Sequence, residues 1–382
     1  MKKVYMKEQK VNISPTQEIK PGGSDKYYEF TDLVYDYGKI DVFPLPGKKG
    51  ISRFLPLLPV EKVYTKIKGL GDTPLTKAKK FGKEVGITDL WIKREDLNPT
   101  GCFKDRESAV IISVALEKGE KVVYVVSSGN AALSTARFAT EAGIDITCYV
   151  PEKTTKGKKE LITDYGAKIE LIPGFYEDVY RTVADMNPPG WNVTSGQNPY
   201  RIEGGKTMAY EIFEQLGEVP DVIVIPSGNG GCLAATWKGF GELKKLGKIN
   251  KLPQMVCVQI KDAAPIKVAL EEGKPYVTLG EIEDSLAEGI VAQESYNSPQ
   301  AVLALKESGG YVIEVTDNEI KAAIKRIIKT EGIIPEFTAG ATFAALLKLN
   351  APKDALVVAV NTGDGKKVLK ELEEEIGEKI NL

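Results

Sequence analysis

Residues 221–246 read DVIVIPSGNGGCLAATWKGFGELKKL, and this stretch decides the fold. It begins with a run of β-branched residues at 221–225, which predicts a buried strand. A turn with three glycines follows at 227–231, and apolar residues then recur with helical spacing over 233–246. A strand, a glycine-rich turn and a helix in this order form the repeating unit of a parallel α/β sheet.

The same unit recurs elsewhere in the chain. Further strands are predicted at 121–126, 145–150, 168–172 and 355–360, and further helices at 131–142, 156–165 and 366–376. Parallel sheets carry helices on both faces and bind ligands at the carboxyl ends of their strands. A chain of 382 residues also suggests about two domains. We therefore predict an α/β protein with two doubly wound, mostly parallel sheet domains.

The sequence contains no histidine. Its absence excludes Ser–His–Asp triads, Cys–His pairs, zinc sites of the HExxH type and a histidine general base. If the chain is an enzyme, its protons must be carried by Lys, Asp, Glu, Tyr, Cys or a cofactor. Chemistry centred on lysine is therefore favoured.

Cysteine usage and charge limit the compartment and the partners. The four cysteines form no CxxC pair, so we expect neither a disulfide framework nor a metal site, and the expected location is the reducing cytoplasm. The formal net charge of −2 gives no reason to expect nucleic acid or a membrane surface as a partner. Because no run of about 18 apolar residues occurs, no membrane span is expected, and no signal peptide is expected at the start.

The turn at 227–231 has the character of a phosphate site. Its glycines let backbone N–H groups converge, and the N-terminus of the next helix adds partial positive charge. The alternative is a tight strand-to-helix turn without a ligand. Nucleotide-binding motifs are not matched, since the turn lacks the Gly-x-Gly-x-x-Gly pattern and the P-loop-like residues 205–207 are preceded by Tyr200 where glycine is required.

A second candidate is Lys104, in the stretch 98–106 that reads NPTGCFKDR. Asn-Pro and Thr-Gly predict a turn, and apolar residues at 109–115 predict a buried helix whose first turn carries the lysine. Burial and the helix dipole favour the neutral amine, which forms imines with carbonyls. A surface lysine is the alternative. A reactive lysine and a phosphate cradle together indicate pyridoxal phosphate, which supplies both an aldehyde and a phosphate.

Eight motifs occur in the order found in one enzyme family. They are Gly71-Asp72-Thr73-Pro74-Leu75, Lys93-Arg94-Glu95-Asp96, the stretch 98–106, Ser127-Ser128-Gly129-Asn130-Ala131-Ala132, NPYRIEGGKT at 198–207, the turn at 227–231, Trp237-Lys238-Gly239-Phe240 and Thr362-Gly363. From about residue 53 onward, the chain resembles the threonine synthase branch of the fold-type-II pyridoxal-phosphate enzymes, in the tryptophan synthase β-like superfamily. Cysteate synthases and serine and threonine dehydratases are related members.

The resemblance implies which residues hold the cofactor. Lys104 would carry pyridoxal phosphate as a Schiff base, Asn130 would bind its 3′ oxygen, and Thr362 would face its pyridine nitrogen. A neutral hydroxyl there would leave that nitrogen unprotonated. The cofactor phosphate would be held in the turn by Ser227, Gly228, Asn229, Gly230 and Gly231.

The resemblance also implies substrate contacts. Ser127 and Ser128 would line the pocket for the substrate carboxylate, and Arg201 and Lys206 would lie on the substrate side. Two simpler interpretations remain open: Ser128 only caps the following helix, and Arg201 only makes a surface ion pair. The substrate would be a small amino acid, and the family is usually dimeric, so we expect a homodimer.

The expected domain organisation places the cofactor cleft between two domains. Residues 1–60 are irregular, with frequent proline and glycine, and are expected to form an N-terminal arm that wraps the body or a partner subunit; a partly disordered arm is the alternative. Residues 61–105 and 200–382 are assigned to a large cofactor-binding domain. Residues 106–199 are assigned to a small substrate-side domain.

The expected reaction is that of threonine synthase, in which O-phosphohomoserine and water give threonine and phosphate. Several residues depart from that pattern: Glu107 and Ser108 after the lysine motif, Ser195-Gly196 before the motif at 198–207, and Ala287-Glu288-Gly289-Ile290, which is more typical of dehydratases. The departures around Ser195 and Glu288 favour the alternative of β-elimination or β-replacement on serine, threonine or O-phosphoserine. A catalytically inactive regulatory homologue is a further alternative, against which the intact Lys104, Asn130 and glycine turn argue.

Overall fold

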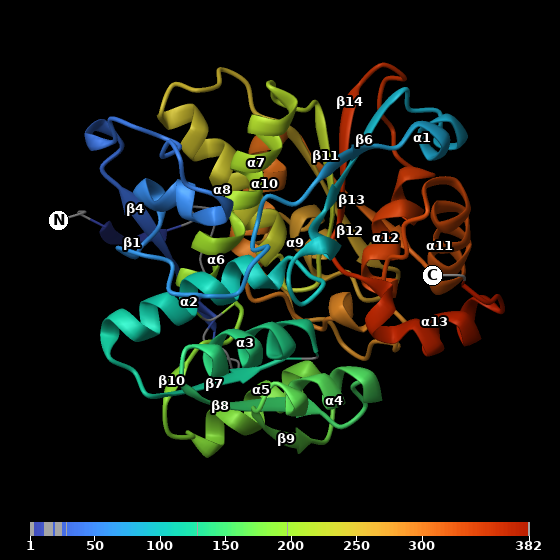
Figure 1. Ribbon diagram of the computed structural model, residues 1–382. Helices are drawn as coiled ribbons and strands as arrows, with labels where there is room; N and C mark the ends of the chain where they lie inside the picture. The colour runs from blue at the N-terminus through green and yellow to red at the C-terminus, as the bar shows by residue number, and fades with distance from the viewer. Residues whose placement is uncertain are drawn as a thin grey trace.

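The structure, a computed structural model, describes residues 4–10, 18–19, 25–27, 29–127, 129–196 and 198–380. Helices surround two separate sheets, the larger one in the upper right and the smaller one at the bottom of Figure 1. Strands within each sheet are mostly parallel, which confirms the predicted α/β fold class.

The larger sheet has six strands in the order β13-β12-β11-β14-β6-β5. Their bounds are β5 (Leu75–Lys77), β6 (Asp89–Arg94), β11 (Val222–Pro226), β12 (Gln254–Ile260), β13 (Tyr311–Val315) and β14 (Leu356–Asn361). Only β5 runs antiparallel to its neighbour among these strands. The central strand β11 is buried along its whole length, as its unbroken apolar run predicts.

Helices cover both faces of the larger sheet. Alternate residues of β11 enter two separate hydrophobic clusters, Val222 and Val224 on one face and Ile223 and Ile225 on the other. The first face carries α1 (Lys79–Val85), α11 (Asp317–Glu331), α12 (Phe337–Leu346) and α13 (Leu369–Ile376). The second face carries α7 (Thr207–Leu216), α8 (Gly231–Lys245), α9 (Pro265–Glu271) and α10 (Ser298–Ser308).

The smaller sheet has four parallel strands in the order β10-β7-β8-β9. Their bounds are β7 (Val122–Val126), β8 (Asp145–Pro151), β9 (Lys168–Ile172) and β10 (Trp191–Asn192). Val123 and Val125 pack in one cluster with α2 (Lys104–Lys118), α3 (Asn130–Glu141) and α4 (Lys156–Asp164), whereas Val126 packs in another with α5 (Tyr176–Met186). This sheet is therefore also covered on both faces.

The N-terminal segment is more regular than expected. β1 (Val4–Lys10) pairs with β4 (Glu29–Tyr35), and a short pair is formed by β2 (Glu18–Ile19) and β3 (Asp25–Tyr27). The prediction of an irregular arm was wrong for these strands. The turn η1 (Tyr37–Lys39) and the 3-10 helix η2 (Gly50–Leu57) follow. Phe54 and Leu57 of η2 pack in the hydrophobic cluster around α7 and α8, and Ile51 packs in the cluster of the smaller sheet.

The predicted strands and helices occur close to their expected positions. β9 has the predicted bounds, whereas β7, β8, β11 and β14 are displaced by one residue at one or both ends. The helix expected at 366–376 begins as the 3-10 turn η5 (Gly365–Val368) and becomes α-helical at Leu369.

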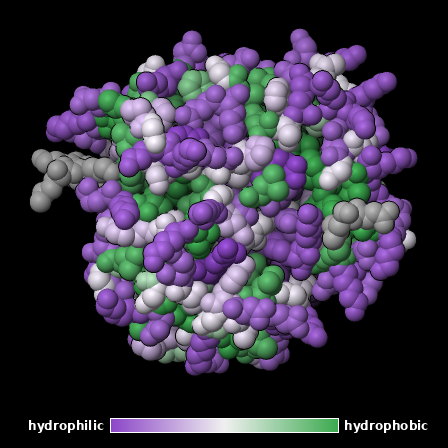
Figure 2. All heavy atoms as spheres, viewed as in Figure 1, coloured by the Kyte–Doolittle hydropathy of each residue, from purple (hydrophilic) through white to green (hydrophobic). Residues whose placement is uncertain are grey.

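The visible surface is mainly hydrophilic, with hydrophobic side chains in scattered patches (Figure 2). Within the described part of the chain, no helix has the length and apolar character that crossing a membrane requires.

Candidate active site

One pocket lies where strands of both sheets end. Its walls come from the turns after β7, β11 and β14, from the first residues of α2 and α3, and from the 3-10 turn η4 (Glu288–Ile290). The residues of this pocket that the sequence predicted are Lys104, Ser127, Asn130, Ser227, Gly228, Asn229, Gly230, Gly231 and Thr362. Residues from four distant parts of the chain are thus brought together at the carboxyl ends of parallel strands.

Lys104 is the first residue of α2, as the sequence predicted, and its side chain is 17% exposed. The Nζ atom lies 3.0 Å from both carboxylate oxygens of Glu107 and 3.4 Å from the hydroxyl of Ser195. It also lies over the ring of Phe103. The amine is therefore held at the wall of the pocket by one carboxylate, one hydroxyl and one aromatic face.

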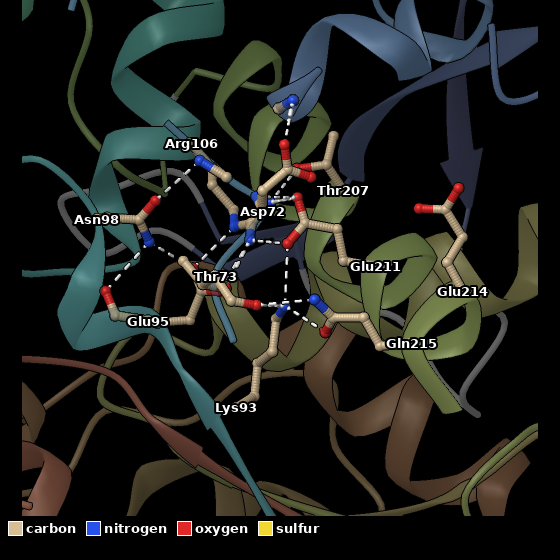
Figure 3. A network of polar contacts seen from close by, with 12 residues as sticks. Asp72, Thr73, Lys93, Glu95, Asn98, Arg106, Thr207, Glu211, Glu214 and Gln215 are labelled. Atoms are coloured by element: carbon tan, nitrogen blue, oxygen red, sulfur yellow. Dashed lines mark hydrogen bonds and ion pairs between the residues drawn. The ribbon is translucent and has the colours of Figure 1, made fainter. Parts of the chain in front are cut away.

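A buried polar network, shown in Figure 3, fixes the helix that carries Lys104. The guanidinium of Arg106 donates to Glu95 and to Glu211, at 2.7 Å from Nε and 2.5 Å from Nη2 respectively. Glu95 also accepts from the hydroxyl of Thr73, and Glu211 from the ammonium of Lys93. Three of the motifs that carry the family resemblance meet in these contacts.

Charge balance in the network is set by its cations. Burial alone would raise the pKa of the Glu211 carboxyl, but Arg106 and Lys93 outweigh burial and hold that pKa well below its usual range. Both partners of the Arg106–Glu211 pair are fully buried. Such pairs fix geometry strongly, because loss of one partner leaves an uncompensated buried charge.

The turn at 227–231 requires glycine at two positions, Gly230 and Gly228. Gly230 adopts φ +81° as the N-cap of α8, and a Cβ there would lie 3.0 Å from that of Ala301. A Cβ on Gly228 would lie 2.9 Å from the Gly289 carbonyl oxygen. Among the described residues, no side chain caps the N-terminus of α8. Its first N–H groups therefore remain available for an anion, and a phosphate fits this position.

Asn130 is the first residue of α3, and both ends of its amide are held. The Nδ2 atom donates to Glu336 at 2.5 Å, and the Oδ1 atom accepts from Lys367 at 2.9 Å. The ammonium of Lys367 also donates to the carbonyl oxygen of Gly101. The amide is thereby oriented in the pocket wall, in a position from which it can donate to a ligand oxygen.

Thr362 follows β14 and is buried in the pocket wall. Its hydroxyl has no hydrogen-bond partner within the described chain. Buried hydroxyls are normally paired, so this orphaned group fits a ligand with a polar atom. Together with the open N-terminus of α8 and the amine of Lys104, it matches the ring, phosphate and aldehyde of pyridoxal phosphate.

The sequence predicted that Ser127 and Ser128, after β7, line the pocket for the substrate carboxylate. Ser127 lines the pocket, and its hydroxyl accepts a hydrogen bond from the backbone N–H of Gly129 at 3.1 Å. Ser128 lies outside the described residues.

Arg201 and Lys206 lie on or beside α6 (Tyr200–Gly205), and neither lines the pocket. Arg201 is buried beneath it, with Nη1 3.6 Å from Glu107 and Nη2 2.7 Å from the hydroxyl of Thr135. The ammonium of Lys206 is fully buried farther away, bound to Glu203 and Glu242. The structure therefore brings Arg201 close to Lys104 through Glu107 but does not bring Lys206 there.

Other polar residues of the site were not assigned a role from the sequence. They are Glu107, Lys158, Tyr176, Ser195, Glu288 and Glu336. Glu107, Ser195 and Glu288 were noted in the sequence only as departures from the family pattern. Lys158 was placed only on a predicted helix, and Tyr176 lies on α5, which was not predicted. The short contact between Lys158 and Glu288 joins the two sheet regions across the pocket.

A second cavity, of about 510 Å³, adjoins the first. It lies between α4 and α5 on one side and α12 and α13 on the other, and it shares residues such as Lys158, Tyr176, Glu288, Glu336 and Thr338 with the pocket. The ion pair of Lys158 and Glu288 therefore stands at the boundary of the two cavities.

Comparisons with known proteins agree with this geometry. The family model described as "Pyridoxal-phosphate dependent enzyme" matches residues 67–363. The chain is 37% identical to the threonine synthase of Methanosarcina acetivorans, over 87% of this chain and 84% of that protein. It is 35% identical to the threonine synthase of Methanocaldococcus jannaschii, over 88% of this chain and 86% of that protein.

Solved structures share the fold. A fungal L-serine ammonia-lyase from Rhizomucor miehei superimposes with a TM-score of 0.69 at 21% identity, covering 81% of this chain and 98% of that chain. The processed form of threonine deaminase isoform 2 from Solanum lycopersicum superimposes with a TM-score of 0.66 at 23% identity, covering 80% of this chain and 83% of that chain.

Two parallel α/β sheets with a lysine and a glycine cradle where their strands end define the fold-type-II class of pyridoxal-phosphate enzymes. The chain belongs to the pyridoxal-phosphate dependent enzyme family, in its threonine synthase branch. Its cofactor is pyridoxal phosphate.

Proposed function

We propose that this chain converts O-phosphohomoserine and water to threonine and phosphate. The observation that carries this proposal is its 35–37% identity to threonine synthases over most of the chain. The pocket agrees with it, because the predicted cofactor residues Lys104, Asn130 and Thr362 line one cavity with the glycine turn.

Each pocket wall has a task toward the cofactor. Lys104 would hold it covalently, the backbone of 227–231 with the N-terminus of α8 would bind its phosphate, Asn130 would donate to its 3′ oxygen, and the hydroxyl of Thr362 would serve its pyridine nitrogen. Pyridoxal phosphate, when bound, supplies an aldehyde for amines and a ring that delocalises negative charge from the α-carbon.

The chain's own residues move the protons. The amine of Lys104 would accept the α-proton of the substrate and deliver protons farther along it. Glu107 and Ser195 hold this amine in place. Ser127 and Ser128 bind the substrate carboxylate in this proposal. Arg201 acts on the substrate side, whereas Lys206 keeps α6 in position through Glu203 and Glu242.

The assembly and location are part of the same proposal. Large and small domains correspond to 61–105 with 200–382 and to 106–199, and the cofactor cleft lies between them. The protein acts as a cytoplasmic homodimer. Its unpaired cysteines support the reducing location, and the usual state of the family supports the dimer.

A second candidate function is β-elimination or β-replacement on serine, threonine or O-phosphoserine. The observation in its favour is the charge of the site. Each cation in or beside the pocket already faces a carboxylate: Lys104 and Arg201 face Glu107, Lys158 faces Glu288, and Lys367 faces Glu336. Serine and threonine carry no phosphate, so a site for either of them needs fewer free cations.

The test is to mix the purified holoenzyme separately with O-phosphohomoserine, O-phosphoserine, serine and threonine. Visible spectra, phosphate, ammonia and amino-acid products are measured. Threonine and phosphate from O-phosphohomoserine alone support the proposal. A 2-oxo acid or a replacement product from serine, threonine or O-phosphoserine, without conversion of O-phosphohomoserine, supports the second function, and a colourless protein without any product indicates an inactive homologue.

The cofactor lysine is tested by Lys104→Ala, which should abolish both turnover and covalent attachment. Borohydride reduction followed by peptide mass spectrometry locates the attachment in the wild-type protein. A Lys104→Ala protein that still yields a reduced, cofactor-labelled peptide would show that another lysine holds the cofactor.

A further inference from the structure

The carboxylate of Glu107 occupies an unusual place beside Lys104. Both residues lie on the first turn of α2, three residues apart, so their side chains meet on one helix face. Both carboxylate oxygens lie 3.0 Å from the Lys104 Nζ atom. Only 4% of the Glu107 side chain is exposed. An ion pair so well shielded from solvent acts more strongly than one on the surface.

The position of Glu107 is fixed by the close approach of α6 to α2. A Cβ on Gly204 would lie 2.0 Å from the Arg106 carbonyl oxygen, and one on Gly205 would lie 3.8 Å from the Glu107 Cγ atom. Gly204 therefore lets α6 approach the turn that carries Glu107, whereas a Cβ on Gly205 would make only an ordinary contact with that residue. The side chain has little freedom to move away from Lys104.

Charged and titratable groups reach this pair from each neighbouring element. Arg201 on α6 lies 3.6 Å from Glu107, and the hydroxyl of Ser195 donates to it at 3.2 Å. Cys232 on α8 also faces the pair, and burial raises the pKa of its thiol, so it stays neutral. Tyr176 on α5 interacts electrostatically with Arg201, and burial likewise raises the pKa of the Tyr176 hydroxyl. Among these groups, Glu107 is the carboxylate in direct contact with the amine.

We propose that Glu107 is a positioning residue that serves as the counter-ion of Lys104 when Lys104 carries the substrate proton. The amine takes the proton from the α-carbon and becomes an ammonium, while the C–H electron pair stays on the substrate. The ammonium then lies against a carboxylate and not against apolar groups, which makes proton removal easier. The inference deepens the proposed function and rests on Lys104 being its proton carrier.

The first measurement uses the cofactor-free protein. Lys104 is treated with acetic anhydride at a fixed, mildly alkaline pH, and its acetylation rate is read by peptide mass spectrometry. Glu107→Gln should raise this rate roughly tenfold or more, because the Nζ atom loses both of its 3.0 Å charge-assisted contacts to the carboxylate, which compete with the reagent for the amine. Exposed Lys168 serves as the internal reference in each digest.

Glu160→Gln is the control, since it also replaces a carboxylate, but one whose exposed ion pair with Lys156 does not touch Lys104. Its acetylation rate should stay near that of the wild type. Glu107→Asp keeps the charge at a changed distance and should give an intermediate rate. Circular dichroism of each variant verifies folding, and Glu107→Asp keeps the inference testable if Glu107→Gln does not fold.

The second measurement uses the holoenzyme with whichever substrate turns over. Glu107→Gln should lower kcat about 100-fold with little change in KM, and Glu107→Asp should restore part of it. An acetylation rate equal to that of the wild type would overturn the inference, as would faster acetylation with an unchanged kcat. If O-phosphohomoserine is not converted, the proposed function fails. The role of Glu107 is then tested by the acetylation rate and by kcat with whichever of serine, threonine or O-phosphoserine turns over.

Discussion

Arg106 and Glu211 form an ion pair with 2.5 Å between Nη2 and Oε2, and neither side chain is exposed. The pair joins α2, which begins with the cofactor lysine, to α7 beneath the second face of the larger sheet. Neither Arg106 nor Glu211 lines the pocket, so this ion pair anchors the helix of the reactive amine from outside the pocket.

Loss of one partner of this pair should destabilise the protein strongly. Glu211→Ala leaves Arg106 and Lys93 without their shared anion, and removal of one partner of a buried pair costs about 3–5 kcal/mol. Urea unfolding of the cofactor-free protein measures the change. Glu160→Ala is the control, because its pair with Lys156 is exposed and should contribute at most about 0.5 kcal/mol. Equal losses in both variants would contradict the structural role of the network.

The same carboxylate predicts how stability depends on pH. The folded pKa of Glu211 lies below its unfolded value of about 4.3, so its contribution is fully present above that value. It is lost as the pH falls from about 4.3 toward the lower folded pKa. The difference in unfolding free energy between wild type and Glu211→Gln should therefore shrink below about pH 4. Urea titrations between pH 7 and pH 3 test this, and a difference that grows toward acid would contradict the sign.

Part of this architecture was readable in the sequence because it is encoded locally. The strand at 168–172 and the helix at 131–142 follow from alternation and helical periodicity, and both occur as β9 and α3. The convergence of Lys104, Asn130 and Thr362 was implied by the family resemblance and not by periodicity, since Asn130 follows β7 of the smaller sheet and Thr362 follows β14 of the larger one.

Other features depend on contacts between distant residues, which periodicity does not encode. β1 pairs with β4 although the two strands are well separated in the sequence and no short hairpin turn joins them, so the segment was expected to be irregular. Lys206 follows Arg201 by five residues, but helix geometry turns its ammonium toward Glu242 on α8. Only the packing of α6 shows that Arg201 lies beside Glu107 whereas Lys206 lies beside Glu242.

Gly230 should be intolerant of a side chain because its φ of +81° is strained for other residues. Gly230→Ala should lower stability by about 1–2 kcal/mol and weaken cofactor binding, since the turn can no longer hold its shape. Urea unfolding and titration of the cofactor by its visible absorbance measure both effects. Gly241→Ala is the matched control in the same helix α8, where a Cβ meets no atom within 4 Å. It should stabilise the protein by about 0.5–1 kcal/mol, and cofactor binding weakened equally in both variants would contradict a special role for Gly230.

Thr362 offers a test that separates cofactor binding from folding. Because its buried hydroxyl has no partner within the described chain, Thr362→Val removes no hydrogen bond from the cofactor-free protein, whose stability should be unchanged or slightly higher. Cofactor affinity should fall roughly 2–10-fold, as expected for one lost hydrogen bond, and the visible band of the holoenzyme should shift.

Thr342→Val is the matched control for this prediction. The Thr342 hydroxyl is also buried, but it donates to the Val360 carbonyl oxygen at 3.1 Å and does not line the pocket. Its loss should reduce the unfolding free energy by about 1 kcal/mol or more while cofactor affinity stays constant. If Thr362→Val instead destabilises the cofactor-free protein and leaves affinity and spectrum unchanged, its hydroxyl serves the fold and the assignment to the pyridine nitrogen is wrong. Weaker cofactor binding in Thr362→Val together with lower stability in Thr342→Val would show that the hydroxyl after β14 serves the cofactor, whereas the hydroxyl of Thr342 on α12 serves the fold.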